Sequence, residues 1–152
     1  MKKEQTNPNL TQELPQQLKE EYRKSRKNSP AIEALKVAAA LKLWNDRGFR
    51  DIKFDVPVAY GGKTMFIKVL AKHEEGTVFG VECASNVRLG YLKQRLSALQ
   101  KCIPKDSYIV SVFPETASEK AEESVTLADE VWVTGKNGKI NQMIFHSYLG
   151  KE

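Results

Sequence analysis

The residues best suited to chemistry lie between Phe66 and Ser85, in the stretch FIKVLAKHEEGTVFGVECAS. Two runs of alternating apolar residues flank a polar turn that ends at Gly76, and this pattern predicts a β-hairpin. Glu82 lies inside the second run, where a carboxylate needs a partner if the strand is buried. Lys68 lies inside the first run, and antiparallel pairing places it roughly opposite Glu82. The sequence therefore predicts an ion pair between Lys68 and Glu82.

This hairpin resembles the central motif of the PD-(D/E)xK phosphodiesterases, the restriction-endonuclease-like superfamily that includes Holliday-junction resolvases. In that pattern the first strand carries an aspartate, as in DVLA, and the second carries Glu-x-Lys. This chain has KVLA from Lys68 and ECAS from Glu82. The glutamate matches, whereas Lys68 occupies the aspartate position and Ala84 the lysine position. The resemblance covers about residues 31–133 and implies a nuclease fold with a degenerate active site.

The resemblance implies an active-site region formed by Glu82, Lys68 and Glu33, because such nucleases often carry a glutamate near the start of the first helix. Carboxylates hold Mg²⁺ and polarise water in metal-dependent phosphodiester cleavage. An ammonium about 4 Å from Mg²⁺ repels it by on the order of 8 kcal/mol at an effective dielectric near 20. We therefore expect no metal cofactor, with Lys68 neutralising Glu82 and also Glu33. The simpler interpretation of Glu33 is a carboxylate favoured by the helix dipole.

An active metal-dependent endonuclease with rearranged catalytic residues is the alternative. Glu82, Glu33 and Asp55 would then bind Mg²⁺ or Mn²⁺, and Lys68 would replace the missing lysine. For Asp55, which lies in a predicted strand, an outward-facing side chain is the simpler expectation.

Capping residues and periodicity define the elements around this hairpin. Ser29 and Pro30 predict the start of a helix that continues to Arg47 and ends at Gly48. A second helix is predicted over Val87–Lys101. Strands are predicted over residues 51–60, 108–113, 130–134 and 140–148, the last two joined by an Asn-Gly turn. The predicted fold class is α/β: a restriction-endonuclease-like αβββαβ core, with a mixed central sheet flanked by helices and an extra C-terminal hairpin.

Residues 1–29 differ in composition from the predicted α/β domain, residues 30–152. They form a polar, basic N-terminal arm, either helical over Thr11–Lys27 or disordered. Its basic residues are Arg23, Lys24, Arg26 and Lys27. The arm is interpreted either as a solvated extension or as a segment that folds on contact with nucleic acid.

The second predicted helix carries Arg88, Tyr91 and Arg95 as a stripe beside its leucine face. Arginine and tyrosine on a helix surface are ordinary solvent-facing residues. Beside a cleft, the same residues bind phosphates and stack on bases. The sequence alone is equally consistent with both interpretations.

The formal net charge of +5 over 152 residues permits binding to a polyanion. Nucleic acid, with DNA favoured over RNA, is therefore the expected partner. No apolar run is long enough to cross a bilayer, so we expect a cytoplasmic protein with no membrane partner. A third interpretation is a protein-interaction or homodimerisation module, in which the Glu130–Tyr148 hairpin supplies an edge for pairing.

Overall fold

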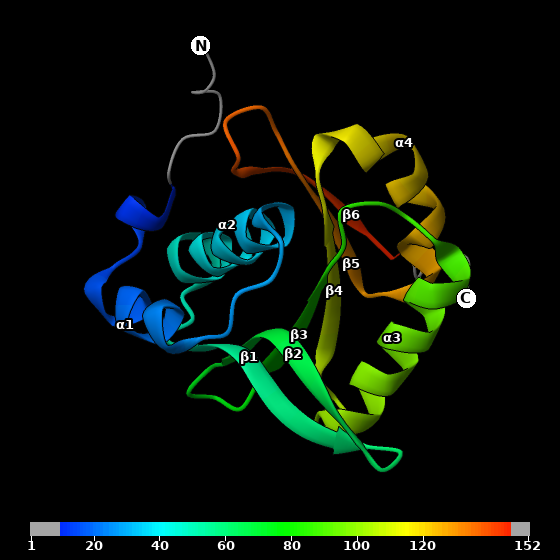
Figure 1. The fold of residues 1–152 in the computed structure, drawn as a ribbon, viewed down its shortest axis with the longest axis horizontal. Coiled ribbons are helices and arrows are strands. Elements are labelled where there is room, and N and C mark those ends of the chain that lie inside the picture. Colours follow the sequence, from blue (N-terminus) through cyan, green and yellow to red (C-terminus); the bar gives the residue numbers. More distant parts are fainter. Residues whose placement is uncertain (1–9, 147–152) are drawn as a thin grey trace.

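A mixed β-sheet lies between two groups of helices, and Figure 1 shows this arrangement. The structure is a computed structural model and describes residues 10–146. Its main elements in chain order are α1 (Gln16–Lys24), α2 (Pro30–Arg47), β1 (Asp51–Tyr60), β2 (Lys63–Lys72), β3 (Val78–Cys83), α3 (Leu89–Cys102), β4 (Tyr108–Phe113), α4 (Ser118–Ala121), β5 (Glu130–Thr134) and β6 (Ile140–Phe145). Short 3₁₀ turns cover Leu10–Glu13, Glu115–Ala117 and Glu122–Leu127.

The six strands form one sheet in sequence order, β1-β2-β3-β4-β5-β6. The β1–β2–β3 meander is antiparallel, β3, β4 and β5 are parallel, and β6 returns antiparallel to β5. The connection from β3 to β4 passes through α3, as a parallel pair requires. The predicted α/β fold, with a mixed central sheet flanked by helices, an αβββαβ order of the core elements and an added C-terminal hairpin, is confirmed. The part of this hairpin beyond residue 146 in the prediction, including Tyr148, lies outside the described residues.

Helix α2 has the boundaries that its capping residues predict. The Ser29 hydroxyl accepts a hydrogen bond from the backbone N–H of Ile32 at 3.4 Å, and Pro30 is the first helical residue. Gly48 ends the helix in the left-handed conformation, with φ of 75°. Residues close in sequence therefore determine both ends of this helix, without any tertiary contact.

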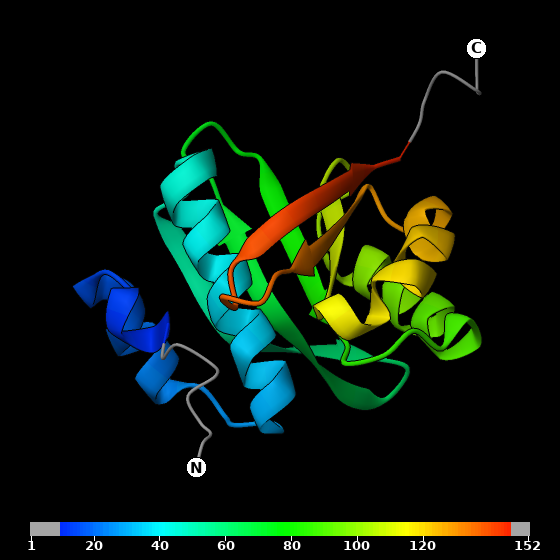
Figure 2. The ribbon, with the colours of Figure 1, turned by 90° about the horizontal axis from the view of Figure 1, so that it is seen from above.

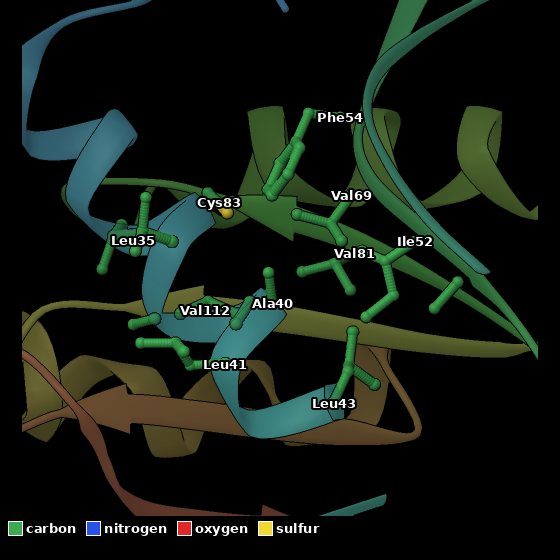
Figure 3. Packing of buried hydrophobic residues seen from close by; sticks show 14 of the residues in the cluster. Leu35, Ala40, Leu41, Leu43, Ile52, Phe54, Val69, Val81, Cys83 and Val112 are labelled. Atoms are coloured by element: carbon green, nitrogen blue, oxygen red, sulfur yellow. The ribbon is translucent and has the colours of Figure 1, made fainter. Parts of the chain in front are cut away.

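The two faces of the sheet carry separate apolar clusters. On one face, α2 packs its buried side chains onto the strands, and Figure 3 shows this contact through Leu35, Ala40, Leu41, Leu43, Ile52, Phe54, Val69, Val81, Cys83 and Val112. On the other face, Leu92, Leu96 and Leu99 of α3 belong to a second cluster with apolar side chains of β2, β4 and β5. The view from above in Figure 2 separates α1 and α2 from α3 and α4 across the sheet. In the described residues, no helix is long and apolar enough to span a bilayer.

The described part of the N-terminal arm belongs to the first of these clusters. Leu10, Leu14 and Leu18 are buried against α2 and the sheet, and burying a leucine side chain stabilises a fold by about 1.5–3 kcal/mol. The predicted helix is present only from Gln16 to Lys24, because Pro15 cannot continue an α-helix from the preceding turn. Residues 10–24 therefore share one core with the α/β domain, while residues 1–9 lie outside the described part of the chain.

Strand β1 changes the face on which its apolar residues pack. Ile52 and Phe54 join the α2 cluster, whereas Val56 and Val58 pack against the α3 cluster. Regular alternation would keep all four on one face. The change occurs at Asp55, whose φ of 49° is the only positive value at a non-glycine residue in residues 10–146. Aspartate is among the few residues that adopt this conformation with modest strain.

Candidate functional site

The hairpin of β2 and β3 brings Lys68 and Glu82 together, as the sequence predicts. Val69 pairs with Val81, so the antiparallel register places the preceding and following residues opposite each other. Lys68 Nζ lies 3.7 Å from Glu82 Oε1, and the exposed fractions of the two side chains are 15% and 8%. The ion pair is therefore mostly withdrawn from water.

Arg95 of α3 binds the same carboxylate from the other side. Its Nε lies 3.1 Å from Glu82 Oε2, and its Nη2 lies 3.2 Å from Oε1. Burial lowers the pKa of Arg95, but the hydrogen bonds and negative charge of Glu82 outweigh it and raise the pKa above its usual value. The predicted stripe of Arg88, Tyr91 and Arg95 therefore needs a correction, since the Arg95 guanidinium faces inward and binds Glu82.

Lys36 is the main site residue that sequence reasoning missed. Its side chain is completely buried, and its ammonium forms ion pairs with Glu33 Oε2 at 2.9 Å and with Asp55. It also donates to the backbone carbonyl of Arg26 at 3.2 Å. The sequence does contain a pattern that indicates burial of Lys36. Position 36 lies one helical turn from the apolar residues Ile32, Ala39 and Ala40. A lysine inside an apolar face needs an acidic partner.

The expectation that Asp55 faces outward is wrong. Its carboxylate is buried and pairs with Lys36, and Oδ1 accepts a hydrogen bond from the Asn28 side chain at 3.4 Å. The positive φ at this residue accompanies the inward orientation. A turn of the backbone within a strand leaves no mark in alternation or propensity, so the sequence did not reveal it.

Glu33 also has a different partner from the one predicted. It pairs with Lys36 rather than Lys68, and it accepts hydrogen bonds from the Tyr22 hydroxyl at 2.7 Å and the Asn28 backbone N–H at 2.6 Å. Burial raises the pKa of Tyr22, and Glu33 raises it further, so the hydroxyl stays protonated and donates. The Glu33 carboxylate therefore joins α2 both to α1, through Tyr22, and to the segment that follows α1, through Asn28.

The pKa of Glu33 makes stability depend on pH. Burial alone would raise this pKa, but the hydrogen bonds from Tyr22, Asn28 and Lys36 together lower it below the ordinary 4.5. A group with a depressed folded-state pKa stabilises the fold above its unfolded-state pKa, and this contribution is lost as the pH falls through the folded value. The free energy of unfolding should therefore fall more steeply below about pH 4.5 in the wild type than in Glu33→Gln. Chemical denaturation at a series of pH values measures this, and equal slopes in the two proteins would contradict it.

The carboxylates in this region are all paired with cations. Both oxygens of Glu82 accept from Arg95, and Lys68 approaches one of them. Glu33 and Asp55 are both paired with Lys36. Metal ions need carboxylate oxygens that are free to coordinate, and within residues 10–146 no group of three His, Cys, Asp or Glu side chains has the geometry for a metal site.

A cleft of about 270 Å³ opens over Lys68 and Glu82. Its walls include Asn28 before α2, Asn86 after β3, and Arg88 and Tyr91 at the start of α3. The Tyr91 side chain is exposed, and its ring lies 5.8 Å from the Arg88 guanidinium. The cleft therefore combines cations, amides and an aromatic ring at one end of the sheet.

The basic residues of the arm have contacts of different kinds. Arg23 pairs with Glu20, and Lys24 lies 3.6 Å from Glu21. The Arg26 guanidinium lies 4.1 Å from the centre of the Phe66 ring, and Lys27 Nζ lies at the same distance from the Tyr22 ring. Arg26 and Lys27 are thus cations without a carboxylate partner among the described residues, whereas Arg23 and Lys24 are partly neutralised.

Two solved structures are similar to this fold. One is an fdxN element excision controlling factor protein from Anabaena variabilis, with a TM-score of 0.53, 19% identity, and coverage of 74% of this chain and 98% of that one. The other is an XisH family protein from Nostoc punctiforme, with a TM-score of 0.53, 18% identity, and coverage of 73% and 98%. No protein-family model and no curated protein matches the sequence. At these identities the likeness establishes the fold.

Proposed function

We propose that this chain is a nuclease-fold domain of the PD-(D/E)xK type that has lost catalysis and binds nucleic acid, or works in a nucleic-acid-processing assembly. The observation that carries the proposal is the pairing of each candidate metal ligand with a cation. Lys68 and Arg95 engage Glu82, and Lys36 engages the other two carboxylates. Arginine and lysine thus stand where cleavage would need a metal ion.

The cations without a carboxylate partner in the described part of the chain favour a polyanion as the partner. Arg88 lines the cleft over Glu82, and Arg26 and Lys27 are exposed on the segment that precedes α2. Such cations bind phosphates, and an exposed ring such as Tyr91 stacks on a base. We favour DNA over RNA. The name of one structural neighbour, an excision controlling factor, is in keeping with this proposal, although the likeness itself concerns the fold.

Binding should weaken as salt concentration rises, because phosphate contacts release counterions. Three contacts, from Arg88, Arg26 and Lys27, give a slope of about −2 in log affinity against log salt on a single strand, or roughly a 20-fold loss between about 50 and about 200 mM. Fluorescence anisotropy with labelled DNA and RNA in EDTA measures this. Arg88→Ala should weaken binding, whereas Lys63→Ala, at the exposed start of β2, should not. No interaction with any DNA or RNA at low salt would overturn the proposal.

Catalytic inactivity has its own test. DNA and RNA substrates are incubated with Mg²⁺ or Mn²⁺, and the wild type is compared with Glu82→Ala. We expect no cleavage by either protein. Cleavage that disappears in Glu82→Ala would instead establish the alternative, an active endonuclease with rearranged residues.

One observation favours a second candidate function, homodimerisation. Strand β6 pairs only with β5 among the described residues, and Phe145 at its end is 55% exposed. An edge strand with apolar side chains can pair with a second copy. Light scattering coupled to size exclusion tests this: a monomer at high concentration excludes it.

A further inference from the structure

The ammonium of Lys68 lacks a hydrogen-bond acceptor within the described residues. Its distance of 3.7 Å from Glu82 Oε1 exceeds hydrogen-bonding length. Both oxygens of Glu82 already accept from Arg95, at 3.1 and 3.2 Å. The Lys68 side chain is only 15% exposed and lines the cleft. An ammonium has three donors for acceptor oxygens, and the cleft is where a ligand can supply those acceptors.

The charges around the cleft leave an excess of positive charge. Arg95 neutralises Glu82, which is the only acidic residue that lines the cleft among residues 10–146. Lys68 and Arg88 then remain as two cations facing the same space. A phosphate monoester carries a charge of about −1.5 to −2 at neutral pH, whereas a diester carries a single negative charge. The charge excess therefore matches a monoester better than a diester.

The size of the cleft also limits the ligand. Its volume of about 270 Å³ is below the range of roughly 300–1,000 Å³ typical of sites for drug-sized molecules. Such a space accommodates one phosphate group with at most one attached nucleoside. Tyr91 at the rim supplies a surface for one base.

We propose that this cleft binds the terminal phosphate of a nucleic-acid strand without a metal ion. Lys68 donates to the phosphate oxygens from the floor, Arg88 donates from the rim, and the terminal base stacks on Tyr91. The ammonium thus takes over the phosphate contact that a metal ion makes in a cleaving enzyme. The inference rests on the proposed function, since it names the group of the nucleic acid that enters the cleft.

The test compares two single-stranded DNA oligonucleotides of the same sequence, one ending in a phosphate and the other in a hydroxyl. The comparison is made once with the phosphate at the 5′ end and once with it at the 3′ end. Anisotropy is measured in EDTA. The phosphorylated strand should bind about tenfold or more tightly, as expected for charge-assisted hydrogen bonds. Lys68→Met should abolish this preference. Arg88→Ala, at an exposed position, should reduce it, and Lys63→Met should retain it.

Calorimetry with thymidine monophosphate separates the two proposals. Equal affinity of the wild type for phosphate and hydroxyl ends overturns the phosphate site and leaves the proposed function standing. Binding of the mononucleotide that Lys68→Met and Arg88→Ala weaken, with no binding of any oligonucleotide, supports the phosphate site and overturns the proposed function. Binding of neither ligand overturns both.

Discussion

Replacing Lys36 with methionine should lower the free energy of unfolding by about 3–5 kcal/mol. The lysine is completely buried and forms ion pairs with both Glu33 and Asp55. Methionine fills a similar volume, so the main effect is to leave two withdrawn carboxylates without their cation. Urea denaturation followed by circular dichroism measures the change. The loss should be visible as a lower midpoint with an unchanged slope.

A matched control lies on the same helix. Lys42 pairs with Asp46 at 2.6 Å one turn away, and the Asp46 side chain is 53% exposed. A surface pair of this kind contributes about 0.3–0.5 kcal/mol, so Lys42→Met should be nearly neutral. If Lys36→Met destabilises no more than Lys42→Met, the buried network has no special energetic role.

A combined variant identifies the cause of the loss. If stranded charges destabilise Lys36→Met, then converting the two acids to amides in the same protein, as Glu33→Gln and Asp55→Asn, should recover part of the stability. A loss from poor packing of methionine would persist in the combined variant. The comparison therefore distinguishes destabilisation by unpaired carboxylates from destabilisation by poor packing of the methionine side chain.

The elements that could be predicted are those with local signals. Ser29, Pro30 and Gly48 define α2 through capping, and alternation defines β1 and the central hairpin. The ion pair of Lys68 with Glu82 follows from counting residues across that hairpin. Each of these inferences uses residues that are near each other in sequence or paired through one turn.

The parts that could not be predicted depend on contacts between distant elements. Arg95 reaches Glu82 from α3, and Lys36 reaches Asp55 from α2 at a point where the backbone of β1 has a positive φ. A charged residue beside a leucine face is usually solvated, and neither interpretation of Arg95 from the sequence, as a solvent-facing or as a phosphate-binding residue, includes its contact with Glu82. The degenerate motif predicts one cation, Lys68, beside Glu82. The described structure also has Arg95 at Glu82, and Lys36 at the other two carboxylates.

Replacing Lys68 with aspartate should create affinity for Mn²⁺ where the wild type has little. The substitution removes an ammonium whose repulsion of a divalent ion is on the order of 8 kcal/mol at about 4 Å. It also places a second carboxylate opposite Glu82, across the hairpin of β2 and β3. Without metal the variant should be less stable than the wild type, because two carboxylates then face each other.

Thermal unfolding with and without Mn²⁺ measures this gain. At a concentration about 100 times the dissociation constant, a bound ion adds about 2.7 kcal/mol, which corresponds to roughly 5–10 °C in a domain of this size. Lys63→Asp makes the same change of charge at an exposed position and should show no such response. Adding Arg95→Gln to Lys68→Asp should enlarge the shift, because Glu82 is then released from its guanidinium partner. A response to Mn²⁺ as large in Lys63→Asp as in Lys68→Asp would mean that Lys68 does not occupy the position of a metal ion, and the account of lost catalysis would have to be abandoned.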